Sequence, residues 1–498
     1  MNTNEKINEY KAWKEKSNAY SLALTVIEFD KETIAPVAGA PYRDHLTAYL
    51  AGEAFSFRTD PEMISLIKDL MNDPSLSFEL KTELELEVKE IDKIVSIPKD
   101  EYVAYQELQG QSFEAWRLAK SKKDYKIFEP VLKKMIESTK ELVSYRHSDL
   151  SIYDRMLDDY EPGWTMKRYD EFFAKLQTRL VPLIAKVKAA KPIDESFLHL
   201  DYPKESQKQF TQYLLKYLGY DPSWGYQGES EHPFTDWNCE NDIRTTTKYL
   251  PNEVSSAILS TVHEVGHAFY AHDVDPKFDG TILFNGVSSG MHESQSRLAE
   301  NYLGRSLPFW QANYTKLQEI FPTQLGKVSV EQFVDAINAS KPSFVRTEAD
   351  ELTYPIHILI RYQLEKGLFN GTISPIDLDK TWNKLYKEYL GIEVTDPALG
   401  ILQDVHWSSG SFGYFPTYAL GSAFAAQFFD AMSSKINVAE LLRDNHYDQV
   451  IAWLKENIHR YGALYPADKI IKMSTGKDFD PDYYLDYLEE KYTKLYNL

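Results

Sequence analysis

Cysteine is almost absent from the sequence, since Cys239 is the only one among 498 residues. A disulfide within the chain is therefore excluded, which fits a reducing compartment such as the cytoplasm. Long apolar runs are missing as well: YALGSAFAAQFF at 418–429 is too short to cross a bilayer, which takes about 20 apolar residues. The first residues, MNTNEKINEYKAWKEK, contain no apolar signal core. We therefore expect a cytoplasmic protein with no membrane partner.

Basic residues are also in short supply, with 55 against 75 acidic residues and a formal net charge of −20. An excess of negative charge opposes binding to nucleic acid and to anionic membrane surfaces, and it favours solubility. The composition is otherwise that of a globular protein, with 43% hydrophobic residues, enough to bury a large core. The many aromatic residues, 34 Tyr among them, suit packing between helices or the walls of a partly wet cleft.

Most of the chain has the apolar spacing of helices. The segments 80–97, 169–190 and 381–392 place apolar residues three to four positions apart. The stretch 219–250 differs, because NCENDIRTTTKYL within it has the β-branched and aromatic content of a short strand or hairpin. The pattern predicts a mainly α-helical fold with a small β-sheet.

No internal repeat and no low-complexity linker divides the chain. We therefore expect a single domain over 1–498. Within it, residues from 1 to about 200 are expected to form an N-terminal helical wall of a cleft. Residues 201–498 are expected to carry the functional residues, with the small sheet beside them.

The sequence HEVGH at 263–267 lies in a segment with a helical apolar stripe. His263 and His267 are four residues apart, so their imidazoles project from one helix face and can bind one Zn²⁺ ion. Glu264 lies on the same turn, where its carboxylate can take a proton from a water molecule that the metal activates. The alternative is a pair of buried histidines hydrogen-bonded to their neighbours.

A catalytic zinc site needs a third protein ligand and an open position. The segment GVSSGMHESQSRLAENYLG, which begins a second helix, offers His292, Glu293 and Glu300, and spacing alone does not decide among them. Glu293 lies one turn before Arg297, which could orient it. His272 has the wrong helical phase for the same ion, and we interpret it as a surface or packing histidine.

Five motifs in a fixed order resemble the carboxypeptidase Taq family of metallocarboxypeptidases. They are DIRTT at 242–246, HEVGH at 263–267, HESQ at 292–295, VRTEAD at 345–350 and GILQDVHW at 400–407. The fourth motif normally opens with Ile where Val345 stands, a conservative difference. YDRMLDDYEPGWT at 153–165 also resembles a family segment. Five ordered motifs are far more specific than HExxH alone.

The resemblance implies that His263, His267 and Glu293 are the zinc ligands and that Glu264 is the general base. It also implies removal of C-terminal residues from peptides with broad specificity, by a cytoplasmic homodimer. The implied fold is mostly helical, with two walls around a cleft, and is related to neurolysin and angiotensin-converting enzyme. Zinc is the usual metal of the family, and cobalt supports activity in some relatives.

An enzyme that removes C-terminal residues must recognise a free carboxylate, which arginine does best through two parallel hydrogen bonds. Arg346 and Arg244 are the candidates for substrate binding. Each of them could instead be a structural partner of a nearby aspartate, Asp350 or Asp242.

The segment 400–421, GILQDVHWSSGSFGYFPTYALG, gathers polar residues between glycines, as in a loop that lines a site. His406 could donate to the substrate carbonyl or to a terminal carboxylate, or it could be a core histidine tied to Asp404. Tyr414 and Tyr418 could donate to the oxyanion of the tetrahedral intermediate, and the sequence does not choose between them.

Three alternative functions compete with this interpretation. A metalloendopeptidase or dipeptidase could use the same zinc site. A di-iron oxidoreductase needs two Glu-x-x-His pairs on helices. Glu264–His267 and Glu456–His459 have that spacing, but His263 would then have no role. The third alternative is a binding protein with a vestigial metal site, which the complete HExxH set opposes.

Overall fold

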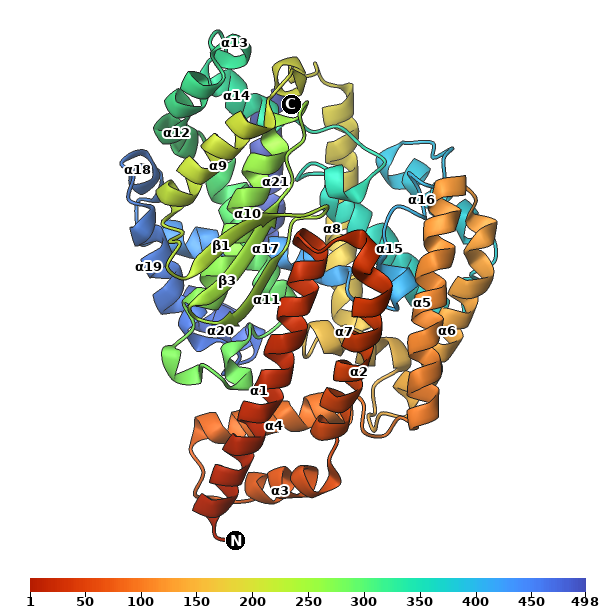
Figure 1. Cartoon of the computed structure of the whole chain (residues 1–498). Coiled ribbons are helices and arrows are strands. Elements are labelled where there is room, and N and C mark those ends of the chain that lie inside the picture. The colour runs from red at the N-terminus through yellow and green to blue at the C-terminus, as the bar shows by residue number, and fades with distance from the viewer.

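The computed structural model describes residues 1–498 and is mainly helical, as predicted (Figure 1). The N-terminal helices are α1 (Thr3–Thr33), α2 (Ala40–Arg58), α3 (Pro61–Met71), α4 (Phe78–Asp92), α5 (Lys99–Lys122), α6 (Glu129–Ser144), α7 (Ile152–Tyr160), α8 (Met166–Ala189) and α9 (Lys204–Leu218). After the sheet follow α10 (Val254–His272), α11 (Ser289–Arg297), α12 (Leu307–Ile320), α13 (Pro322–Leu325), α14 (Val330–Ile337), α15 (Tyr354–Asn370), α16 (Leu378–Leu390), α17 (Pro416–Ser433), α18 (Val438–Arg443), α19 (Tyr447–Asn457), α20 (Ala467–Thr475) and α21 (Asp482–Tyr496).

The helices predicted from periodicity are present with small shifts at their ends. The segment 80–97 corresponds to α4, 169–190 to α8 and 381–392 to α16. The largest difference is at the end of α4, where residues 93–97 form turns instead of helix. Pro98 follows these turns, and a residue before proline is disfavoured in the helical conformation.

A three-stranded sheet occupies the stretch that the sequence marks as non-helical. Its strands are β1 (Gly225–Glu229), β2 (Thr235–Cys239) and β3 (Asp242–Thr247). They lie in the order β1-β3-β2, with β3 parallel to β1 and antiparallel to β2. Because β3 is central, β2 is an edge strand, and both β2 and β3 pack against α10 (Figure 1). The predicted small sheet is therefore confirmed.

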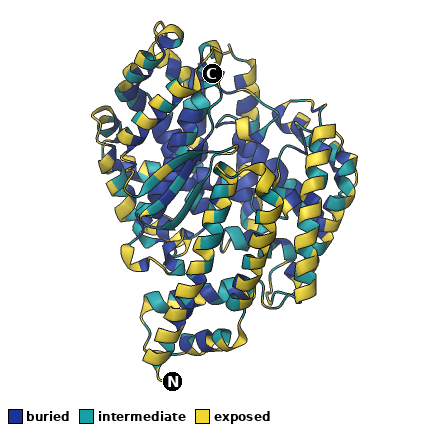
Figure 2. Cartoon of the chain, in the orientation of Figure 1, coloured by how far each residue is buried: buried dark blue, intermediate teal, exposed yellow.

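The hydrophobic core has three separate parts, one large and two small. A cluster of 90 buried residues runs from Ala119 in α5 to Tyr492 in α21 and passes residue 200 without a break. A much smaller cluster joins α1, α3 and α4 and includes Tyr10, Trp13 and Ile67. Figure 2 shows the same contrast, since buried residues concentrate around the sheet while the N-terminal helices are largely exposed or intermediate. The division of one domain at about residue 200 stays a prediction.

Three helices pack unusually closely at the centre of the main core: α10, α11 and α17. A Cβ atom at Gly266 of α10 would lie 2.6 Å from the backbone oxygen of Gln295 in α11. A Cβ atom at Gly421 of α17 would lie 2.7 Å from the Cβ atom of Glu293. Because neither distance leaves room for a side chain, glycine at these two positions allows α11 to lie between its neighbours. After Arg297, α11 continues as a π-helical segment, Leu298–Gly304.

The start of α11 is held by Glu161, a fully buried residue that follows α7. Its Oε2 accepts a hydrogen bond of 3.0 Å from the backbone N–H of Gly290, while Oε1 has no partner. Burial raises the pKa of Glu161 from 4.5 to about 8, and hydrogen bonds from Ser288 and Gly290 oppose the rise. The folded chain therefore holds a proton between these two pH values that the unfolded chain has released.

We expect the free energy of unfolding to fall as the pH rises through this window. The loss due to Glu161 can reach about 1.4 kcal/mol for each pH unit between the unfolded and the folded pKa. Urea unfolding at about pH 5.5 and about pH 8.5 measures it, and Glu161→Gln should reduce the difference between the two values. Glu62→Gln, at an exposed position of α3, is the control. Equal pH dependence in Glu161→Gln and the parent would contradict the assignment.

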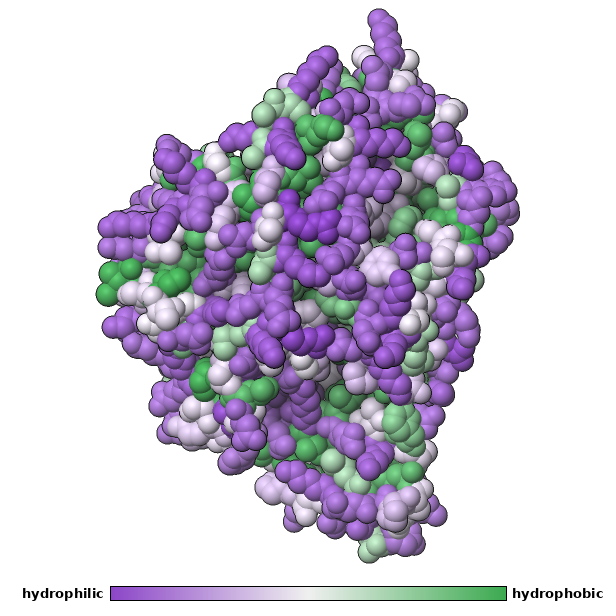
Figure 3. Space-filling view, turned by 180° about the vertical axis from the view of Figure 1, so that it is seen from behind, coloured by the Kyte–Doolittle hydropathy of each residue, from purple (hydrophilic) through white to green (hydrophobic).

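None of the helices combines the length and the apolar character that a membrane crossing requires. The face opposite to the view of Figure 1 is mostly hydrophilic, with apolar groups scattered among the polar ones (Figure 3). This surface agrees with the charged-residue content of the sequence, 26%.

Candidate active site

Three residues with metal-ligand chemistry converge where α10 meets α11. Ligand atoms of His263, His267 and Glu293 all lie within 4.8 Å of one another. Oε2 of Glu293 is 3.7 Å from Nε2 of His263 and 3.5 Å from Nε2 of His267. Two imidazole nitrogens and one carboxylate oxygen are a donor set of catalytic zinc sites. These residues therefore fit a divalent metal ion.

The other two candidates for the third ligand contact the opposite side of each imidazole. Oε2 of Glu300, in the π-helical segment, lies 2.9 Å from Nδ1 of His263. Nδ1 of His292 lies 2.9 Å from Nδ1 of His267. Both therefore orient a histidine ring from behind, away from the three converging ligand atoms. The geometry favours Glu293 over Glu300 and His292 as the third ligand.

These contacts also determine which ring nitrogen is free for a metal. Glu300 accepts a hydrogen bond from Nδ1–H of His263, and the neutral form of this tautomer carries its lone pair on Nε2. Burial lowers the pKa of His292 well below its usual value, so this ring is neutral. A neutral His292 can accept at Nδ1 from Nδ1–H of His267, and the tautomer of His267 that donates there carries its lone pair on Nε2.

Arginine side chains keep the carboxylates of the site ionised. Nε of Arg297 donates to Oε1 of Glu293 over 2.6 Å, and its NH1 atom donates to Glu300 over 3.1 Å. Burial by itself would raise the pKa of Glu293, but Arg297 and the two histidines lower it below its usual range. Arg305 donates to Glu300 over 2.9 Å. The prediction that Arg297 orients Glu293 agrees with this geometry, and an ionised carboxylate is what a metal requires.

Glu264 lies beside this cluster with 5% of its surface exposed. Its carboxylate lines the same cavity as His263, His267 and Glu293. Oε2 of Glu264 accepts a hydrogen bond of 2.6 Å from the hydroxyl of Thr235 in β2. The sequence gives no local signal for Thr235, although the alternating side chains of a predicted strand make every second residue a candidate for such a contact.

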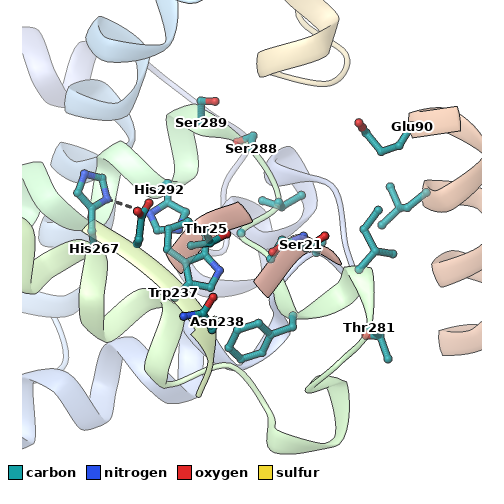
Figure 4. Close-up of a pocket in the computed structure, with 18 of the residues that line it drawn as sticks. Ser21, Thr25, Glu90, Trp237, Asn238, His267, Thr281, Ser288, Ser289 and His292 are labelled. Atoms are coloured by element: carbon teal, nitrogen blue, oxygen red, sulfur yellow. Dashed lines mark hydrogen bonds between the residues drawn. The ribbon is translucent and has the colours of Figure 1, made fainter. Parts of the chain in front are cut away.

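The cavity is a cleft of about 1670 Å³ between the N-terminal helices and the part of the chain that carries the metal-ligand candidates. Residues of α1, α4 and α7 line one side, and β2, α10, α11 and α17 line the other. A helical cleft is therefore present, and the assignment of residues from 1 to about 200 as its N-terminal wall stays a prediction. Figure 4 shows residues from both sides: Ser21, Thr25 and Glu90 from the N-terminal helices, and Trp237, Asn238, His267 and His292 from the opposite side.

Besides Thr235, two further residues of the cleft were not predicted from the sequence, Trp237 and Tyr160. The ring of Trp237 in β2 stacks on His292, with centroids 4.6 Å apart, and so supports the ring that contacts His267. Tyr160, at the end of α7, lines the cleft and packs edge-on against Tyr414 at 5.0 Å. Tyr160 belongs to the motif at 153–165, and this motif was the one feature of the sequence that could have indicated its place in the cleft.

Tyr414 and Tyr418 both line the cleft, as predicted for residues that could contact substrate. Their ring centroids are 5.0 Å apart. Burial raises the pKa of both phenols above their usual value. Both therefore keep their protons at neutral pH and can donate a hydrogen bond.

Arg346, Arg244 and His406 lie outside the cleft lining. Arg346 is 7% exposed, and its Nε donates to Asp404 over 3.0 Å. Its partner is therefore Asp404 and not the nearby Asp350. Arg244 makes the alternative contact that the sequence suggested, with two hydrogen bonds of 2.8 and 2.9 Å to Asp242.

His406 packs behind the two cleft tyrosines, with its centroid 4.4 Å from that of Phe415. Burial and then Arg346 lower the pKa of His406 to about 4, so the ring is neutral at pH 7. Its Nδ1 has no hydrogen-bond partner within the protein. The suggested tie to Asp404 is not made, because Arg346 and Arg361 occupy that carboxylate.

Two other histidines of the second half have packing roles. His272 stacks on Trp224 at 4.0 Å and contacts the backbone oxygen of Glu240, as expected for a packing histidine. His459 lies between Asp273 and Gln295, while Glu456 pairs with Arg460. The second Glu-x-x-His pair of the di-iron alternative is therefore engaged elsewhere.

Comparisons with known proteins agree with this site. The model of the carboxypeptidase Taq (M32) metallopeptidase family matches residues 9–492. Carboxypeptidase 1 of Bacillus subtilis is 41% identical over 483 residues, 96% of each chain. Thermostable carboxypeptidase 1 of Thermus thermophilus is 34% identical over 498 residues, 97% of each chain.

Solved structures extend the agreement to the whole fold. The M32 carboxypeptidase from Deinococcus radiodurans R1 superposes with a TM-score of 0.96 at 31% identity, over 99% of this chain and 100% of that chain. A carboxypeptidase structure from Pyrococcus furiosus superposes with a TM-score of 0.95 at 32% identity, over 99% of both chains. With the converging histidines and carboxylate, these matches show that the chain belongs to the carboxypeptidase Taq (M32) family and is a metallocarboxypeptidase, a peptide hydrolase.

Proposed function

We propose that this metallocarboxypeptidase uses zinc held by His263, His267 and Glu293 to release C-terminal amino acids from peptides of varied sequence. The observation that carries the proposal is the convergence of these three donors beside Glu264. Two imidazoles and one carboxylate suit Zn²⁺, and Co²⁺ can take the same ligands. Such an ion supplies a Lewis acid that polarises the scissile carbonyl and lowers the pKa of a water molecule.

Glu264 is the proposed general base. Its carboxylate accepts the proton of the attacking water and passes it to the nitrogen of the leaving amine. It lies on the wall of the cleft, next to His263 in sequence and within reach of a peptide in the cavity. This reaction needs oriented histidines and an ionised third ligand. Glu300 orients His263, and His292 orients His267. Arg297 keeps Glu293 ionised.

The peptide is proposed to lie extended along β2. As the edge strand of the sheet, β2 presents backbone groups that do not pair with β3, and an extended peptide can use them as an added strand. All five residues of β2 line the cleft. The neutral phenols of Tyr414 and Tyr418 are the proposed donors to the oxyanion, with His406 packed behind them.

Arg346 and Arg244 stay the candidates for the terminal carboxylate of the substrate. Each would have to exchange an aspartate partner for that carboxylate, Asp404 for Arg346 and Asp242 for Arg244. Such an exchange keeps the arginine paired, which the buried guanidinium of Arg346 and the half-buried one of Arg244 both require.

We further propose that the enzyme is a cytoplasmic homodimer whose partners are peptides with a free C-terminus. Large apolar side chains lie exposed near the end of α1 and along α2: Ile34 (77%), Val37 (86%), Tyr42 (73%) and Tyr49 (70%). Exposed apolar side chains gathered in this way are typical of surfaces that contact another protein.

A pair of matched peptides tests the reaction. With the zinc-loaded enzyme, a peptide with a free C-terminus should lose single residues in succession. Its C-terminally amidated twin should react on the order of 100-fold more slowly, because a charge-assisted carboxylate contact is missing. Mass spectrometry of the products and metal analysis of the protein are the measurements. Internal fragments, or equal rates for both peptides, would contradict the proposal.

A further inference from the structure

The carboxylate of Glu264 has a single hydrogen bond within the protein, and Thr235 donates it. Oγ1 of Thr235 lies 2.6 Å from Oε2 of Glu264 and 3.1 Å from the backbone oxygen of the same residue. Glu264 takes part in no ion pair, whereas Glu293 nearby contacts both His263 and His267. Thr235 is therefore the one side chain that restricts the rotation of this carboxylate by a directed contact.

The position of Thr235 follows from the geometry of β2. Successive side chains of a strand point to opposite faces, so Thr235 and Trp237 share one face. Both contact the metal-binding part of the molecule, Thr235 through Glu264 and Trp237 through His292. The register is set by β3, where Thr245 is paired with Thr235 and is fully buried. β2 thus holds two of the side chains beside the candidate metal ligands.

We propose that Thr235 is a positioning residue for the general base, an inference that rests on the proposed role of Glu264. Because the hydroxyl of Thr235 donates to Oε2, Oε1 is left to accept the proton of the attacking water. When Glu264 is protonated on Oε1, Oε2 still accepts from Thr235, so the contact persists while the proton moves on to the leaving amine. Thr235 keeps its own proton throughout. A base held in this way needs no reorientation between the two transfers.

Strand β2 therefore serves both the binding of the peptide and the positioning of the general base. Its free edge is the proposed binding surface for the peptide backbone, and its inward face holds Glu264. A peptide aligned on β2 is aligned with the base by the same residues, since Thr235 belongs to the strand that the peptide contacts.

Replacement of Thr235 by valine tests the proposal with almost no change of shape. Valine keeps the β-branched form that suits a strand but lacks the hydroxyl. We expect Thr235→Val to lower kcat by about 10- to 100-fold, the effect of a lost hydrogen bond to a charged group, with KM within about twofold. Thr235→Ser keeps the hydroxyl and should restore most of the parent kcat.

Thr245→Val is a matched control. Thr245 lies opposite Thr235 on β3, and its hydroxyl has no hydrogen-bond partner, so this variant removes a hydroxyl from the same sheet without touching Glu264. It should leave kcat within about twofold of the parent.

Two further readouts separate positioning from a general structural role. Metal content and resistance to chelator should be the same in Thr235→Val and the parent. The solvent deuterium isotope effect on kcat should rise in Thr235→Val, because proton transfer becomes slower relative to the other steps. Loss of metal in parallel with activity, or a Thr235→Ser variant as slow as Thr235→Val, would overturn the proposal.

Comparison of Glu264→Gln with Thr235→Val separates the role of Thr235 from the role of Glu264. If Glu264→Gln keeps its turnover, Glu264 is not the base and the proposed function fails. If Glu264→Gln is inactive and Thr235→Val is fully active, only the role of Thr235 is overturned.

Discussion

Replacement of Glu264 by glutamine is expected to lower kcat by about 10³- to 10⁴-fold while the metal stays bound. Glutamine has nearly the same shape as glutamate but cannot accept the proton of the attacking water at neutral pH. Its amide oxygen can still accept from Thr235, so the contact that holds the side chain survives. The three proposed metal ligands are unchanged, and the variant should therefore bind metal like the parent.

Steady-state kinetics on a peptide with a free C-terminus measures this effect, together with the metal content of the same preparation. Glu331→Gln, which removes a carboxylate from an exposed position of α14, is the control and should keep kcat within about twofold of the parent. A Glu264→Gln variant that contains stoichiometric metal and keeps more than about one tenth of the parent kcat would contradict the role of general base.

Removal of the Glu293 carboxylate is expected to have the largest effect on metal binding. Glu293→Gln should lower metal affinity by at least about 10³-fold, since it replaces an ionised ligand by a neutral one. Glu300→Gln should lower the affinity by about 10- to 100-fold, because it weakens only the contact behind the ring of His263. The two variants are matched, because both remove one buried carboxylate that contacts Arg297.

Competition with a chelator of known affinity measures both values without reference to catalysis. Circular dichroism should confirm that each variant is folded, since both leave Arg297 with one carboxylate partner fewer. If Glu300→Gln loses the metal and Glu293→Gln keeps it, the assignment of the third ligand is reversed.

Much of the secondary structure could be predicted because it depends on neighbours in sequence. The apolar spacing of α4, α8 and α16 is local, and the predicted segments overlap these helices apart from their ends. The same applies to the stretch 219–250, most of whose β-branched residues lie in β3 at the centre of the sheet. The helix ends were predicted less accurately, because capping contacts and turns determine where a helix ends.

Contacts in the candidate site between residues far apart in the sequence could not be predicted. Arg346 has Asp350 four positions away, but the structure pairs it with Asp404, 58 residues further along the chain. Thr235 lies 29 residues before Glu264 and has no motif of its own. Contacts of this kind depend on which helices and strands pack together. The spacing of residues within one helix or strand does not indicate its packing partners.

By itself, the sequence determined that His263, Glu264 and His267 share one turn of a helix, because residues one, three and four positions apart on a helix have a fixed geometry. Only the tertiary structure brings the proposed third ligand, Glu293, to the two histidines. Glu293 reaches the two histidines because Gly266 lets α11 approach α10, and Thr235 reaches Glu264 because β2 packs on the same helix. These distances are set by side-chain packing between elements, which separation along the chain does not determine.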